Sequence, residues 1–193
     1  MKKAGIWFVT VALLLAGCGG GASQPSQSPL PVELPETEPE GQTLELFFSS
    51  GAGAWSTEIT LQPDGSFTGF YSDADMGSSG EDYPNGTVYL CGFEGEFSEK
   101  VPRDEYSWSM TLESLTHDYE EGKEWIEDGV RYVSSEPYGM EQGTEFVLYR
   151  PETPSEGLNE EFWSWWPFRG NDSPETLELY GLWNVEMGYG FFG

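Results

Sequence analysis

The chain has few of the residues on which common catalytic and metal-binding sites depend. It contains a single histidine, His117, among 193 residues, so a zinc site built from several histidines is excluded. It also lacks a Gly-x-Ser-x-Gly motif, which would present a nucleophilic serine on a sharp strand-to-helix turn. His117 is therefore expected at a strand end or on the surface, without a catalytic role.

Basic residues are equally scarce. Eight lysines and arginines face 34 aspartates and glutamates, which gives a formal net charge of −26 at pH 7. A chain this acidic is repelled by nucleic acid and by anionic lipid headgroups. The composition excludes nucleic acid as a partner and leaves metal ions, basic peptides, sugars and apolar small molecules.

The most apolar stretch, residues 4–15, is too short for a membrane-spanning helix, which needs about 20 residues. It follows two lysines and ends at the motif Leu15-Ala16-Gly17-Cys18, an arrangement typical of a cleavable export signal. A cysteine directly after Leu-Ala-Gly resembles the lipobox of bacterial lipoprotein precursors. An uncleaved anchor or an ordinary secretory signal is the alternative.

The resemblance implies that residues 1–17 are removed and that a diacylglyceryl group is attached to the thiol of Cys18. Two acyl chains are enough for stable anchoring, so we expect the protein on the extracytoplasmic face of the cell membrane. Cys91 is then the only free thiol, and no internal disulfide can form. It lies in a strand-like run without neighbouring positive charge, which predicts a buried, unreactive cysteine.

Residues 18–42 have a different composition from the rest of the chain. After the lipidated cysteine they are rich in Gly, Ser, Glu and Pro, with almost no large apolar side chains. Such a segment cannot bury enough apolar surface to offset its ordering entropy. We expect a disordered tether that spaces an acidic β-rich domain, residues 43–193, from the membrane.

The dominant signal of residues 43–193 is period-two alternation in short runs, typical of antiparallel β structure with one face on a core. The predicted turns are Pro63-Asp64-Gly65-Ser66, Asn85-Gly86 and Asp128-Gly129. The predicted strands are 43–48, 55–61, 66–71, 86–93, 93–99, 106–113, 123–126, 129–133 and 144–149.

A change of period follows near the C-terminus. Leu158, Phe162, Trp165 and Trp166 share one helical face; Ser155 or Asn159 could cap the helix. One helix over 155–166 and a final strand over 177–181 are therefore predicted. Many short strands, one helix and a closing strand favour a closed antiparallel up-and-down barrel, with a β-sandwich as the alternative.

Gly53-Ala54-Trp55, on an early predicted strand, resembles the Gly-x-Trp signature of lipocalins. That family also places a helix and a short strand after an eight-stranded barrel that holds a small apolar ligand. The family's usual downstream arginine and disulfide are not evident here. The resemblance implies that Trp55 closes one end of the barrel and is a candidate ligand contact.

Two further sets of residues are candidate sites. Asp73, Asp75, Glu81 and Asp82 cluster in a loop rich in glycine and serine and could hold Ca²⁺, although their spacing is not that of an EF-hand. A solvated acidic loop is the alternative. Trp163 lies off the predicted apolar helix face and is a candidate for an exposed, sugar-binding aromatic, whereas most C-terminal aromatics are expected to fill the core.

These observations favour a non-enzymatic, lipid-anchored envelope protein with a β-barrel-like binding or interaction domain. Its ligand could be a small molecule, a glycan or a protein. No cofactor is expected beyond the lipid on Cys18. Two alternatives stay open: a carbohydrate-active hydrolase with paired carboxylates, distinguishable by a deep cleft between them, and a structural or assembly lipoprotein.

Overall fold

A computed structural model describes residues 41–168 and 174–193. The signal segment 1–17, Cys18 and nearly all of the tether lie outside the described residues. Among the described residues, no helix is long and apolar enough to cross a membrane.

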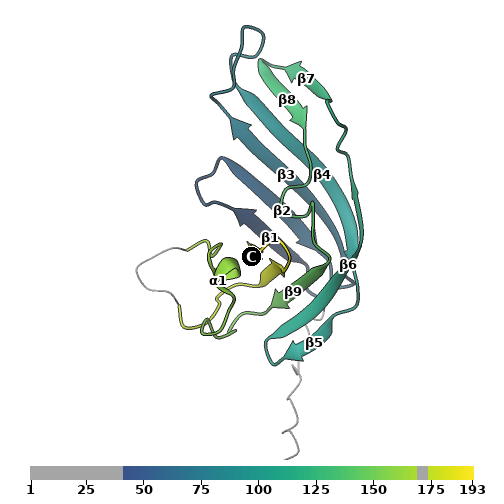
Figure 1. Cartoon of the computed structure of the whole chain (residues 1–193), viewed down its shortest axis with the longest axis vertical. Helices are drawn as coiled ribbons and strands as arrows, with labels where there is room; N and C mark the ends of the chain where they lie inside the picture. Colours follow the sequence, from purple (N-terminus) through teal and green to yellow (C-terminus); the bar gives the residue numbers. More distant parts are fainter. Residues whose placement is uncertain (1–40, 169–173) are drawn as a thin grey trace, which may run out of the picture. The chain divides into compact units, whose positions relative to one another are not determined.

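Eight antiparallel strands close into a barrel (Figure 1). In chain order they are β1 Leu44–Ser49, β2 Trp55–Leu61, β3 Ser66–Asp75, β4 Thr87–Phe97, β6 Ser107–His117, β9 Glu145–Tyr149, β10 Gly181–Asn184 and β11 Tyr189–Phe192. Each pairs with the next in this order, and β11 returns to β1. The prediction of an up-and-down barrel is confirmed, and the sandwich alternative is wrong.

Three further strands pair with the ends of barrel strands and extend the sheet beyond the closed part of the barrel. β5 Val101–Asp104 pairs with the beginning of β6, while β8 Val130–Ser134 runs parallel to the first half of β4 and pairs with β7 Glu124–Glu127. The hairpin predicted around Asp128-Gly129 is confirmed, with both residues at positive φ, as a tight two-residue turn requires.

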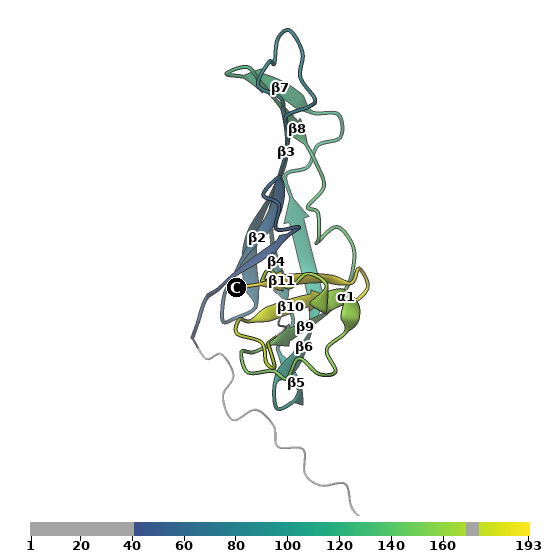
Figure 2. The same cartoon turned by 90° about the vertical axis from the view of Figure 1, so that its left-hand side faces the viewer.

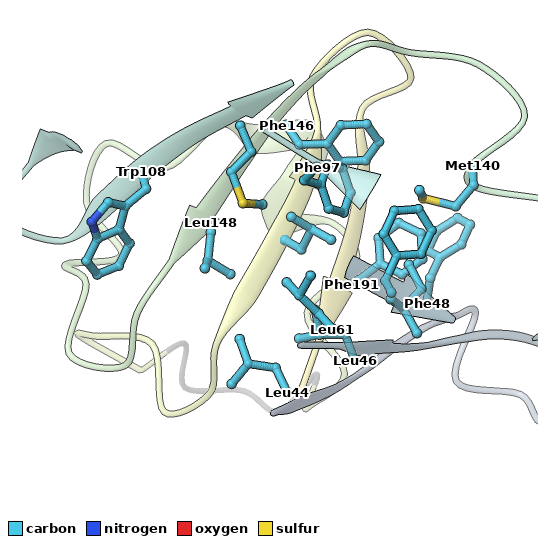
Figure 3. Close-up of a cluster of buried hydrophobic side chains, with 14 of the residues drawn as sticks. Leu44, Leu46, Phe48, Leu61, Phe97, Trp108, Met140, Phe146, Leu148 and Phe191 are labelled. Carbon is cyan, nitrogen blue, oxygen red and sulfur yellow. The ribbon is translucent and has the colours of Figure 1, made fainter. Parts of the chain in front are cut away.

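Large apolar side chains fill the barrel interior. Figure 3 shows Trp108 at one end of this core and Phe48, Phe191 and Met140 at the other. Phe97, Phe146 and Leu148 lie between them and are fully buried. The interior is therefore a packed core, as in other barrels of eight strands whose side chains meet at the axis.

A second core covers the outer face of β9, β10 and β11. Val147, Tyr149 and Phe192 point outward from these strands and pack against Phe162 and Trp166. Most of the C-terminal aromatics are thus core residues, as predicted. This layer also explains why β10 and β11 show no alternation: both of their faces are buried.

The single described helix, α1 Glu160–Trp163, is shorter than the predicted 155–166. Of the two candidate caps, Ser155 and Asn159, it is Asn159 that caps the helix, since its Oδ1 accepts hydrogen bonds from the amides of Glu161 and Phe162 at 2.8 and 3.3 Å. Gly157 has a φ of +95°, which interrupts the helix before this cap. The segment predicted as the final strand, 177–181, is largely irregular, and the strand begins only at Gly181.

The helix also precedes the last two barrel strands, whereas the lipocalin resemblance implies a helix after the barrel. The expected position of the helix relative to the barrel is therefore wrong for this chain. The likeness is limited to the closed barrel of eight strands.

Two cross-strand phenylalanine–glycine pairs mark the most tightly packed part of the wall. Phe67 faces Gly95, and Gly69 faces Phe93, in consecutive inward positions of β3 and β4. A Cβ on Gly95 would lie 2.3 Å from the Ser114 carbonyl oxygen and 2.5 Å from the Phe67 ring. The rings therefore occupy the space that side chains on these glycines would need, an arrangement that lets sheets curve.

We predict that Gly95→Val lowers the free energy of unfolding by about 2–3 kcal/mol, because the new side chain overpacks the wall. Urea unfolding monitored by circular dichroism measures the change. Thr68→Val, at an exposed position on the neighbouring strand β3, is the matched control and should change stability little. Equal stability of Gly95→Val and wild type would contradict the role of this pair.

Candidate binding surface

The acidic loop does not assemble into a metal site. Asp75 Oδ1 accepts hydrogen bonds from the amides of Gly77 and Ser78 at 2.9 and 3.1 Å and so serves the turn after β3. Within residues 41–168 and 174–193, no group of three or more metal-ligating side chains comes together. Asp73, Glu81 and Asp82 are therefore not brought together with Asp75 in such a group.

Trp55 lies where the lipocalin resemblance places it, at one end of the barrel. Its ring packs edge-on against Phe48 and Tyr138, with centroids 4.9 and 5.1 Å away, and against Trp165 at 6.2 Å. It is half-buried in this group. Trp55 is thus part of an aromatic plug, and the plug leaves its ring little surface for a ligand inside the barrel.

The loop between β8 and β9 crosses this same end and completes the plug. Thr57 Oγ1 donates to the Tyr138 carbonyl oxygen at 2.6 Å, and the fully buried Asn184 amide donates to the carbonyls of Gly139 and Gln142 at 3.1 and 2.7 Å. Met140 is buried beneath the loop. The loop is therefore fastened to β2 and β10, on two different parts of the barrel wall.

Ionisable groups in the plug are held towards their neutral forms. Burial, together with the nearby Asp73 and Glu141, raises the pKa of Tyr71 to about 12. The pKa of Tyr138 is also raised, by burial and by its hydrogen bond with Tyr189. Burial raises the pKa of the Glu141 carboxyl as well, against the opposing effect of main-chain hydrogen bonds.

Trp163 is not freely exposed. It is half-buried and stacks on Trp166, with ring centroids 5.2 Å apart and an interplanar angle of 15°. Phe168 is the more exposed aromatic in this region. The stacked pair lies at the rim of the second core. None of the four pockets found among the described residues is lined by Trp163, so the predicted sugar contact has no pocket to support it.

His117 and Cys91 lie near the point where β6 ends. A shallow depression of about 390 Å³, lined by His117, Asp118 and Glu94 among others, opens on this part of the wall. Asp118 Oδ1 accepts a hydrogen bond from the Gly92 amide at 2.8 Å. Cys91 is buried, as predicted, and burial with the neighbouring Asp118 raises its pKa to about 12.

Three exposed large apolar side chains, Phe70, Trp125 and Ile126, lie on a part of the sheet that leaves the barrel. β4 pairs with β6 only from Phe93 onwards, and residues 87–90 pair instead with β8. We call residues 70–75, 87–92, 124–127 and 130–134 the sheet extension. In Figures 1 and 2 it lies at the opposite end of β3 and β4 from β5 and β9.

One face of the extension continues the outer wall of the barrel and carries an apolar stripe. Ala74, Val88, Tyr132 and Trp125 align in a single row across four strands, and Phe70 lies on the same face. The side chain of Phe70 is 46% exposed and that of Trp125 is 38% exposed. Trp125 stacks on Tyr132 with ring centroids 5.2 Å apart, so the stripe ends in a flat aromatic pair.

Searches of family models, curated proteins and solved structures return no match to this chain.

Sequence reasoning did not select Phe70, Trp125 or Tyr132 as site residues. The signal was present: the hairpin of residues 123–133 was predicted, and the alternation of Trp125 with Ile126 places an apolar side chain on each face of β7. Both side chains are exposed, which a strand covering a core would not allow. Only the pairing of β8 with β4 shows that the hairpin lies beyond the barrel.

We predict that Glu141→Gln stabilises the protein at neutral pH and that the advantage disappears as the pH falls. A carboxyl whose pKa is raised on folding binds its proton more tightly in the folded state, so wild type gains stability from this group as the pH drops towards the ordinary glutamate pKa of 4.5. Thermal unfolding of both proteins between pH 7.5 and about 4.5 measures the difference. Parallel curves with a constant offset would contradict it.

Proposed function

We propose that the protein is a lipid-anchored, extracytoplasmic binding protein that contacts its ligand through the sheet extension. The barrel serves as the rigid support of that surface. The observation that carries the proposal is the exposed apolar stripe on the extension. Contiguous exposed apolar surface on a soluble domain is typical of an interaction site.

The contents of the barrel favour a surface site over an internal one. Lipocalin-like ligand binding needs an open cavity within the barrel, whereas here Phe48, Phe97 and Phe146 occupy the axis. The plug of Trp55 and Tyr138 then closes the end nearest the extension. A small apolar ligand would have to displace this packing, while the stripe is open to solvent.

Anchoring rests on the sequence motif that ends at Cys18. A two-chain lipid holds a protein stably at a membrane without a spanning helix. The Gly/Pro-rich residues after it, in a segment of flexible-linker composition, give the acidic domain reach away from the anionic headgroups.

For the anchor, we predict that cells grown with labelled palmitate incorporate the label into the wild-type protein and that Cys18→Ala abolishes incorporation. The variant should also move from the membrane fraction to the soluble or unprocessed fraction. Cys91→Ala is the control, because its thiol is buried in the sheet, and it should be labelled as wild type is. Persistent labelling of Cys18→Ala contradicts the anchor.

For the binding surface, we predict site-dependent photo-crosslinking in intact cells. A photoreactive phenylalanine analogue at Phe70 or Trp125 should give adducts of increased mass. The same analogue at Val101, a 60% exposed residue on the opposite sheet edge, should give none. Adducts at Val101 alone, or at none of the three positions, contradict the assignment of the ligand to the extension.

A further inference from the structure

The sheet has two edge strands, β5 and β7, outside the closed part of the barrel. β5 has two features that block an edge and that β7 lacks: Pro102 has no amide hydrogen, and the pairing with β6 is irregular there. β7 contains neither proline nor lysine, and its four residues pair with β8 in unbroken register. Of these two edges, β7 is the one left open.

Main-chain groups of β7 point out from this edge. The Ser134 amide donates to the Lys123 carbonyl oxygen at 2.9 Å, so the alternation of an antiparallel pair directs the groups of Trp125 and Glu127 towards β8. The main-chain N–H and C=O groups of Glu124 and Ile126 point away from β8. Among the described residues, none forms a hydrogen bond with these outward groups. The edge can therefore accept another strand.

The charge around β7 selects the chemistry of that strand. β7 and the residues beside it carry five acidic side chains: Glu120, Glu121, Glu124, Glu127 and Asp128. The two basic side chains nearby already have partners within this chain. Lys123 pairs with Glu120 at 2.5 Å, and Arg131 lies over the Tyr83 ring and 3.9 Å from Glu124. Both β7 glutamates are exposed. A cationic strand would be attracted, and an acidic one would be repelled.

The same argument disfavours a second copy of this chain. Outward-facing residues of one copy can lie opposite only outward-facing residues of the other, so antiparallel pairing of two β7 strands centred on Trp125 would set Glu124 opposite Ile126 and Glu127 opposite Lys123. That pairing would also bring together two edges that each carry five acids and two bases, so their net charges repel. A partner with basic residues opposite Glu124 and Glu127 would be attracted instead.

We propose that β7 binds an extended segment of a partner protein by strand addition, and that the segment has a basic–apolar–apolar–basic pattern. This rests on the proposed function and names the class of its ligand. Basic residues pair with Glu124 and Glu127, while the two apolar residues pack beside Trp125 and Ile126 on opposite faces. Because Glu-Trp-Ile-Glu has the same pattern in both directions, the segment can run parallel or antiparallel to β7. Main-chain hydrogen bonds give such complexes affinity, and the side-chain pattern gives specificity.

The test uses full-length protein in detergent and a fluorescein-labelled peptide, Thr-Lys-Val-Val-Lys-Thr, with binding followed by fluorescence anisotropy. Wild type should bind it, and a version with glutamates for lysines should not bind. A peptide N-methylated at alternate amides, which cannot donate main-chain hydrogen bonds, should lose at least roughly tenfold in affinity. The absence of binding to wild type would overturn the proposal.

Two variants separate the main-chain and charge contributions. Ile126→Pro removes an outward amide without removing a hydrogen bond to β8, so it should stay folded by circular dichroism and lose binding. Glu124→Gln with Glu127→Gln should weaken binding roughly tenfold and reduce its salt dependence. The control, Glu94→Gln with Glu113→Gln, removes two exposed charges elsewhere and should bind as wild type does.

Equal binding to wild type and folded Ile126→Pro would overturn the proposal. So would sedimentation that shows a wild-type dimer converted to a monomer by Ile126→Pro, because the occupant would then be a second copy. If the peptide does not bind while crosslinks still form at Phe70 and Trp125, the extension remains the proposed binding surface and strand addition of a basic segment is rejected. If the peptide binds but those crosslinks are absent, the apolar stripe is rejected as the binding surface and strand addition at β7 is retained.

Discussion

The structure depends on the division of β4 between two neighbours. From Phe93 onwards this strand pairs with β6 and closes the barrel, and from Thr87 to Leu90 it pairs with β8. At the junction, the Asp118 amide donates to the Gly92 carbonyl oxygen at 3.0 Å, and the Asp118 carboxylate accepts from the Gly92 amide at 2.8 Å. One residue thus satisfies both main-chain groups of Gly92 where β6 ends. The chain can then leave the barrel without exposing an unpaired section of β4.

That division separates a part of the sheet that surrounds the barrel core from a part whose outermost strand has none. Inside the barrel, Phe48 contacts the rings of Trp55, Tyr138, Trp165, Tyr189 and Phe191. On β7 there is no such interior, so apolar residues on both faces meet solvent, as Trp125 and Ile126 do. Exposed apolar side chains lower solubility because they favour association between molecules. The acidic residues around β7 counter this effect, since like charges repel two copies of the protein. Packing and electrostatics therefore act on different parts of one sheet.

The fold was predictable where one face of a strand meets the core. Residues 55–61 alternate between buried and exposed positions, as their sequence indicates, and the turns at Gly65 and Gly86 adopt the positive φ that the sequence predicts. Prediction failed where burial has no period. Phe191 faces the barrel core and Phe192 the second core, so β11 has no alternation to detect. The helix was overextended because its apolar spacing continues through residues that Gly157 and the loop contacts of Ser155 hold in other conformations.

The candidate site was hidden for a different reason. Strand propensity placed a hairpin at 123–133 but could not show which strand it joins, because parallel pairing with β4 leaves no local signal. The same β7 sequence would be an ordinary half-buried strand if it closed the barrel. Its significance arises only from position: Pro102 blocks the edge at β5, whereas the edge at β7 keeps its outward amides and two exposed glutamates. The difference between the two edges is therefore the strongest structural argument that β7 is kept open for a partner.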